Sequence, residues 1–208
     1  MKIALLANNV SKEEFLFKKI PSSVEIIMVG SLSQLVLTKN ADAYFDLEFV
    51  MDDERIRQLH SLLPKPIFIN SITNTLTEID QPFIRINAWP TFLKRNICEI
   101  VADENQKNIA KEILDNLQRS FQFVPDVPGM ITARIIAMII NEAYYTFEDD
   151  VSTKEEIDIA IKLGTNYPFG PFEWSEKIGL KNIYDLLLQL SKTDSRYTIS
   201  KSLQKEIE

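Results

Sequence analysis

The chain has 208 residues, of which 45% are hydrophobic and 25% are charged, as expected for a globular protein with a substantial core. Its net charge of -7 is spread over both halves, so no basic stripe is available to bind nucleic acid. The single cysteine, Cys98, excludes an internal disulfide. The longest apolar run, residues 135–140, is too short to cross a bilayer. We therefore expect a cytoplasmic protein with no membrane contact.

Short apolar segments alternate with helical patterns in the first part of the chain. Strands are predicted at residues 2–7, 24–29, 43–47, 66–70, 83–87, 97–102 and 121–124, and helices at 11–20, 52–63 and 103–119. Ser11 with Glu14, and Asp103 with Gln106, form capping pairs that predict two of the helix starts. Strands that alternate with helices predict a mostly parallel sheet covered on both faces, here over residues 1–124.

The second part of the chain has a different pattern. No strand pattern recurs after the segment FVPDVPGM, so residues 125–208 predict an all-α domain. Helices are predicted at 130–147, 180–190 and 197–207. A further helix is predicted between the first two of these, starting at a capping box of Ser152 and Glu155 and ending at Gly164. The helix at 130–147 is apolar on nearly every side, and the three helices after it offer too little surface to cover it. We therefore expect a homodimer formed through this domain.

The first strand leads into a helix, which is how a dinucleotide-binding domain begins, but the connecting turn reads Asn8-Asn9-Val10. A pyrophosphate at such a turn needs glycines, because a Cβ would clash with the tight bend and with the phosphate, and no glycine precedes Gly30. The second strand ends at Val29, where a carboxylate for the ribose hydroxyl would be expected. The turn therefore predicts that no nicotinamide cofactor is bound.

Two stretches of the helical domain carry a specific pattern, DVPGMITARIIAMIINEA at 126–143 and EEIDIAIKLGTNYPFGPFEWSEKIGL at 155–180. On these stretches the chain resembles the C-terminal domain of the L-3-hydroxyacyl-CoA dehydrogenase family. The residues that match the family pattern are Asp126, Pro128, Gly129, Arg134, Glu142, Ala143, Asp158, Gly164, Pro168, Gly170, Pro171, Phe172, Glu173 and Gly179. The segments ADAYFDLEF and IFINSITNTLTEI resemble the family more faintly in the first domain. The resemblance implies a reduced Rossmann-like domain followed by an all-α dimerisation domain.

The resemblance also implies a reaction, in which NAD accepts a hydride from the carbon that bears a 3-hydroxyl group. A histidine, oriented by a glutamate, takes the proton of that hydroxyl. Glu99 matches that glutamate, while the histidine position falls on Asn87 without gaps, or on Ile86 with one gap. The family serine is replaced by Thr73 or Asn74, and a family asparagine by Ala133. Neither Asn87 nor Ile86 can act as a base.

Other charged residues have simpler interpretations. The one histidine, His60, lies in the helix at 52–63 and is expected to be a surface or half-buried residue there, in preference to a relocated base. Arg85, Lys94 and Arg95 near Trp89 either hold CoA phosphates or form a solvated strand end, and we favour the second interpretation. The acidic run at 148–150 is expected to be a solvated loop, and no metal site is predicted.

Three functions remain open. The first is a dimeric 3-hydroxyacyl-CoA dehydrogenase-like protein that no longer transfers hydride and binds an acyl-CoA or similar thioester, or a protein partner. The second is an active NAD-dependent L-3-hydroxyacyl-CoA dehydrogenase of fatty-acid metabolism, with an atypical site in which Glu99 and Thr73 have altered roles. The third is a structural partner of another enzyme. The missing glycines favour the first over the second.

Overall fold

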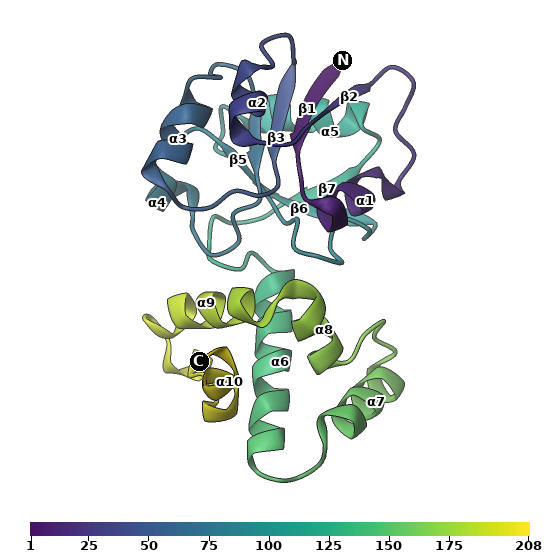
Figure 1. The fold of residues 1–208 in the computed structure, drawn as a ribbon, viewed down its shortest axis with the longest axis vertical. Coiled ribbons are helices and arrows are strands. Elements are labelled where there is room, and N and C mark those ends of the chain that lie inside the picture. The colour runs from purple at the N-terminus through teal and green to yellow at the C-terminus, as the bar shows by residue number, and fades with distance from the viewer. The chain divides into compact units, whose positions relative to one another are not determined.

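The computed structural model describes residues 1–208, which form two compact units, Met1–Met130 and Ile131–Glu208 (Figure 1). All strands belong to the first unit, and the second is built from helices. No helix in either unit combines the length and the apolar character needed to cross a membrane.

A seven-stranded sheet forms the centre of the first unit, in the order β2-β1-β3-β4-β5-β6-β7. Neighbouring strands run parallel except for β5 and β6, which are antiparallel. The strands are β1 (Lys2–Leu6), β2 (Glu25–Val29), β3 (Ala43–Asp46), β4 (Ile67–Ile69), β5 (Ile84–Ile86), β6 (Ile97–Val101) and β7 (Ser120–Phe123). The chain passes from β1 to β2 on one side and returns to β3 on the other, so the strand order reverses between β1 and β3. In open α/β sheets this point is where ligands bind.

Helices cover both faces of the sheet. They are α1 (Asn9–Phe17), α2 (Leu32–Leu37), α3 (Asp53–His60), α4 (Leu76–Ile79) and α5 (Lys107–Asn116). One apolar core contains Phe15 of α1 and Leu114 of α5, and the other contains Leu35, Leu59 and Ile79 of α2, α3 and α4. This three-layer arrangement confirms the predicted α/β class.

Several helix ends differ from the prediction. Asn8 caps α1, because its side-chain oxygen accepts the Ser11 N–H at 2.9 Å, so Ser11 lies inside the helix. Asp103 accepts the Gln106 N–H at 2.9 Å in a turn that precedes α5, and the helix starts only at Lys107. α2 and α4 are additional helices, of six and four residues, too short to produce a recognisable helical period.

The second unit packs its helices around α6 (Thr132–Glu148) (Figure 1). The others are α7 (Lys154–Thr165), α8 (Pro171–Ile178), α9 (Leu180–Ser191) and α10 (Lys201–Ile207), with a 3₁₀ turn, η1 (Ser195–Tyr197), before α10. α7 is capped by Thr153 and Glu156, not by Ser152 and Glu155, because Thr153 is the residue with extended backbone next to the first helical turn. Four helices follow α6 instead of the predicted three, since α8 begins at Pro171, in a segment where no helix was predicted.

The enclosure of α6 is partial. Ile136, Ile140 and Tyr144 are buried by the helices of the same unit, whereas Ile131 and Ile135 are 41% and 52% exposed.

The side chain of Asn141 joins α6 to the segment before α10, donating to Thr198 O at 2.8 Å and accepting from Ser200 N at 3.0 Å. Glu148, the first residue of the acidic run, accepts the Lys201 N–H at 2.8 Å in the first turn of α10, so it is not merely solvated.

Candidate functional site

Asn87 and Glu99 form a buried polar pair at the junction of β5 and β6. The Asn87 side-chain amide donates to the Glu99 carboxylate at 3.2 Å, and the Asn87 backbone N–H donates to the Glu99 carbonyl at 3.1 Å. The two residues are 3% and 8% exposed. The Asn87 side-chain oxygen is buried without a hydrogen-bond partner, an arrangement that costs free energy in a folded protein.

The pair lies on one face of the sheet because side chains alternate along a strand. Ile84 and Ile86 of β5, with Cys98 and Ile100 of β6, pack into the core on the α1 and α5 side. The intervening residues Arg85, Asn87 and Glu99 therefore point to the opposite face, where they extend the apolar surface of β1, β3 and β4 as a buried polar strip.

The loop after β4 approaches the same strands. Asn70 accepts the Ala88 N–H at 3.1 Å and donates to Leu47 O at 3.3 Å, so its side chain links the carboxyl ends of β3, β4 and β5. Thr73 follows on this loop and is half-buried. It lies between Ser71 and Asn74 in the chain, and the Ser71 hydroxyl donates a hydrogen bond to Asn74 O. The structure thus brings Asn87 and Glu99 into contact and leaves Thr73 on the neighbouring loop, outside the hydrogen-bonded pair.

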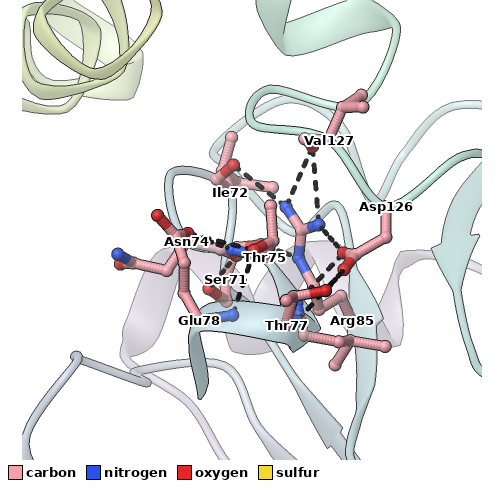
Figure 2. A network of polar contacts seen from close by, with 10 residues as sticks. Ser71, Ile72, Asn74, Thr75, Thr77, Glu78, Arg85, Asp126 and Val127 are labelled. Carbon is pink, nitrogen blue, oxygen red and sulfur yellow. Dashed lines mark hydrogen bonds and ion pairs between the residues drawn. The ribbon is translucent and has the colours of Figure 1, made fainter. Parts of the chain in front are cut away.

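Arg85 organises this loop from within the protein (Figure 2). Its side chain is fully buried and donates to Ser71 O at 2.8 Å, Ile72 O at 3.1 Å and the Asp126 carboxylate at 2.5 Å, with longer contacts to Val127 O. Burial lowers the pKa of Arg85 from its ordinary value and the bond to Asp126 opposes this shift, yet a guanidinium remains charged. Both predicted roles of Arg85, phosphate binding and solvation, are therefore wrong.

Asp126 completes the network from the segment that leads out of the first unit. Its carboxylate accepts the Leu76 N–H at 3.0 Å and the Thr77 N–H at 3.3 Å, at the start of α4. Gly129 donates its N–H to Ile72 O at 2.8 Å with φ of 78°, a left-handed conformation that favours glycine. Within the first unit, Asp126 and Gly129 of the motif hold the loop and the exit segment together.

The turn after β1 contains no left-handed residue. Asn8 has φ of -69° and its side chain is used as the cap of α1. Asp46, a buried carboxylate at the end of β3, binds Arg55 of α3 through two hydrogen bonds of 2.7 and 2.6 Å. The Asn8 side chain and the Asp46 carboxylate are thus already engaged with the protein itself.

The remaining candidate residues differ in their exposure. Trp89 is buried, whereas Lys94 and Arg95 are exposed and lie over the rings of Phe17 and Phe92, each 5.6 Å from the ring centre. His60 is exposed at the end of α3, as predicted. Ala133 is fully buried in the first turn of α6. Asn70 is a site residue that sequence reasoning missed, although its place directly after a buried strand is a usable signal.

Known proteins share both parts of this arrangement. Residues 129–208 match the family described as 3-hydroxyacyl-CoA dehydrogenase, C-terminal domain. The chain is 28% identical over 201 residues to the 3-hydroxybutyryl-CoA dehydrogenase of Bradyrhizobium diazoefficiens, covering 86% of the chain and 69% of that protein. It is 42% identical over 76 residues to the 3-hydroxyadipyl-CoA dehydrogenase of Escherichia coli, covering 36% of the chain but only 16% of that longer protein.

The solved structures agree in fold. The crystal structure of (S)-3-hydroxybutyryl-CoA dehydrogenase from Ralstonia eutropha matches with a TM-score of 0.76 over 99% of this chain and 93% of that one, at 15% identity. The helical unit at residues 129–208 belongs to the 3-hydroxyacyl-CoA dehydrogenase family by its C-terminal domain. The whole chain shares the two-unit fold of the dehydrogenase structure.

Proposed function

We propose that this family member does not carry out NAD-dependent hydride transfer and acts as a dimeric protein that binds an acyl-thioester or a protein partner. The observation that carries the proposal is the hydrogen bond between Asn87 and Glu99. It supports the gapless register, in which Glu99 orients the side chain at the histidine position. An amide at that position cannot take the hydroxyl proton, and loss of a general base lowers rates by about 10²–10⁴-fold.

The turn after β1 supports the same proposal independently. Asn8 caps α1 and the turn lacks the glycines that let a backbone approach a pyrophosphate. The paired Asp46 and Arg55 are not free to bind a ribose. Two separate requirements of the family reaction, the base and the cofactor cradle, are thus altered together.

The thioester and the dimer have their own support. The relatives are named for hydroxyacyl-CoA substrates, so a CoA thioester is the ligand class to test first. The partly uncovered apolar surface of α6, including Ile131 and Ile135, supports association through the helical unit.

An active NAD-dependent L-3-hydroxyacyl-CoA dehydrogenase is the second candidate. The names of the relatives favour it, and Glu99 and Thr73 would then act in altered roles. A partner protein without any small-molecule site is a third candidate, consistent with the same geometry.

Ligand titration with a turnover assay separates these candidates. A ligand at about a hundred times its dissociation constant stabilises a protein by about 2.7 kcal/mol, so binding raises the melting temperature visibly. We expect no rise with millimolar NADH and no acetoacetyl-CoA reduction at any pH. A rise with acyl-CoA but not with free CoA supports thioester binding, and no rise with either favours a partner protein. Turnover that scales with the concentration of repurified protein contradicts the proposal.

A further inference from the structure

Three aromatic rings of the helical unit surround the side-chain ammonium of Lys154. Its Nζ atom lies over the rings of Tyr144, Phe147 and Phe172, at 5.1, 5.3 and 5.2 Å from the ring centres. A cation within about 6 Å of a ring centre is attracted by the negative face of the ring, so all three contacts are within range. Each of the other cations that lie over a ring in this chain contacts a single ring. The three rings thus form an aromatic cage around one ammonium group.

The rings stand at steep angles to one another, as the walls of a cage require. The ring centres of Tyr144 and Phe172 are 4.9 Å apart with an interplanar angle of 65°, and those of Phe147 and Phe172 are 6.4 Å apart at 76°. Tyr144 and Phe172 are buried, whereas Phe147 and the Lys154 side chain are 37% and 30% exposed. The cage therefore has two buried walls and a third wall at the surface, where a ligand from solvent can reach it.

A carboxylate completes the cage. The Lys154 ammonium pairs with the Glu206 carboxylate of α10 at 2.5 Å. Burial raises the pKa of the Tyr144 hydroxyl above its usual value, and the nearby Glu206 carboxylate adds to the shift, so Tyr144 stays neutral. The occupant of the cage thus meets three ring faces and one negative charge. Aromatic cages of this kind bind organic ammonium ions, including quaternary ones.

The position of Lys154 in α7 is not explained by that helix itself. Lys154 is the first residue of α7, directly after the Thr153 cap, and Glu155 and Glu156 follow it. The helix dipole favours acidic residues in the first turn and disfavours a cation there. The contacts of Lys154 with α6, α8 and α10 offset this unfavourable placement. Lys154 therefore behaves as a ligand that the chain supplies to its own cage.

We infer that Tyr144, Phe147, Phe172 and Glu206 form a binding site for an organic ammonium ion, and that Lys154 is its built-in occupant. A free ligand of the same class, such as a quaternary ammonium head group, takes the place of the lysine once that side chain is removed. N-methyl groups are accepted, because the charge is kept and more apolar surface contacts the rings. The inference is independent of the proposed function, since the residues of the cage take no part in the candidate site of the first unit.

Thermal unfolding of Lys154→Ala in the full chain tests the site by refilling it. Tetramethylammonium chloride, at about ten times its dissociation constant, should raise the melting temperature about 2–4 °C more than sodium chloride at the same concentration. tert-Butanol, a neutral molecule of similar size, should not reproduce this rise. Lys181→Ala is the matched control, because Lys181 pairs with Asp185 in the same unit and lies over only one ring. It should respond equally to the two salts.

Two outcomes of these melts overturn the inference. If Lys154→Ala responds equally to tetramethylammonium and sodium, the cage does not bind an organic ammonium ion. If tert-butanol stabilises the variant as much as tetramethylammonium does, the space left by the lysine merely takes up apolar volume and does not select a cation.

Reductive methylation of the unmodified protein gives a second measurement, which does not depend on the folding of Lys154→Ala. The reaction converts accessible lysines to dimethyl-lysines that keep their charge, and isotopically labelled formaldehyde makes each N-methyl group visible by NMR. The N-methyl protons of Lys154 should be shifted upfield by the three ring faces, and the signal should be absent from Lys154→Arg, which assigns it. A spectrum without such a signal shows that the cage expels a methylated ammonium group, and it overturns the inference.

Discussion

Arg85 shows what one buried charge can do in this chain. It is fully buried, and its N–H groups are directed at three backbone carbonyls and the Asp126 carboxylate. A charge in such a place costs a large desolvation free energy, which its hydrogen bonds must offset. Arg85 thereby connects β5, the loop that carries Thr73 and the exit segment at 126–129 (Figure 2).

Replacing Arg85 by Met is expected to destabilise the first unit strongly. Removing one partner of a buried ion pair leaves the other uncompensated, at a cost of about 3–5 kcal/mol. Arg85→Lys keeps the charge without the planar fork and should give an intermediate loss. Chemical denaturation measures both, with Lys111→Met as the control, since Lys111 pairs with Asp115 at the surface and should change stability by less than about 1 kcal/mol. Equal losses for Arg85→Met and Lys111→Met would contradict a structural role for the network.

At the scale of elements, α7 and α8 are joined by a contact that only glycine permits. A Cβ on Gly170 would lie 2.3 Å from the Asp158 carboxyl group, and Asp158 cannot move away without releasing the start of α8. Gly170→Ala is therefore expected to destabilise the helical unit by about 1–3 kcal/mol. Gly164→Ala is the matched control in α7, because nothing lies within 4 Å of its Cβ, and it should stabilise by about 0.5–1 kcal/mol. Thermal unfolding of both variants decides the point, and a stable Gly170→Ala would show that Asp158 is not needed as a cap.

The capping glutamates of the same helices predict a dependence on pH. The hydrogen bond from Lys162 holds the pKa of Glu173 below its usual value, with the Gly170 N–H adding to the effect. The Ser152 hydroxyl and the Thr153 N–H lower the pKa of Glu156 in the same way. Since the pKa values are lower in the folded state, this stabilisation is present above the unfolded pKa of about 4.3 and is lost as the pH falls through the folded values.

The double variant Glu156→Gln with Glu173→Gln should accordingly melt at a lower temperature than the unmodified protein near neutral pH. The difference in melting temperature should shrink as the pH falls and vanish once both glutamates are protonated in the folded protein. Circular dichroism melts from about pH 7 to about pH 3 measure this difference. A difference in melting temperature that stays constant from about pH 7 to about pH 3 would mean that the carboxylates do not titrate as these contacts require.

The helices that are long enough to show a hydrophobic period, and the buried strands, could be predicted from the sequence. All seven strands lie within one or two residues of the predicted ranges, because runs such as IFIN have few alternatives between turn residues. Caps were less predictable, since Asn8 and Ser11, or Ser152 and Thr153, offer equivalent oxygens and the backbone conformation selects one of them. α2 and α4 were missed because each makes fewer than two full turns.

At the scale of the whole molecule, the site could be predicted only in part. Asn87 and Glu99 were identified by their spacing relative to a family pattern, and their contact follows from the antiparallel pairing of β5 and β6. The role of Arg85 could not be predicted, because a charged residue in an apolar strand is compatible with a ligand, solvent or a buried partner. Its partner, Asp126, lies 41 residues away in the sequence, and only the folded chain brings the two together.

Restoring the histidine alone should not restore a dehydrogenase. In Asn87→His the new imidazole can donate a hydrogen bond to Glu99, as the Asn87 amide does now. The variant should therefore fold, and its histidine should titrate. Hydride transfer also requires a bound nicotinamide, and the turn at Asn8 and the Asp46–Arg55 pair remain unchanged. We therefore expect no acetoacetyl-CoA reduction and no NADH-induced rise in melting temperature, with Asn87→Gln as the matched control. Turnover in Asn87→His but not in Asn87→Gln would show that the cofactor site is intact and that the base alone is missing, and the proposal of a lost cofactor site would have to be given up.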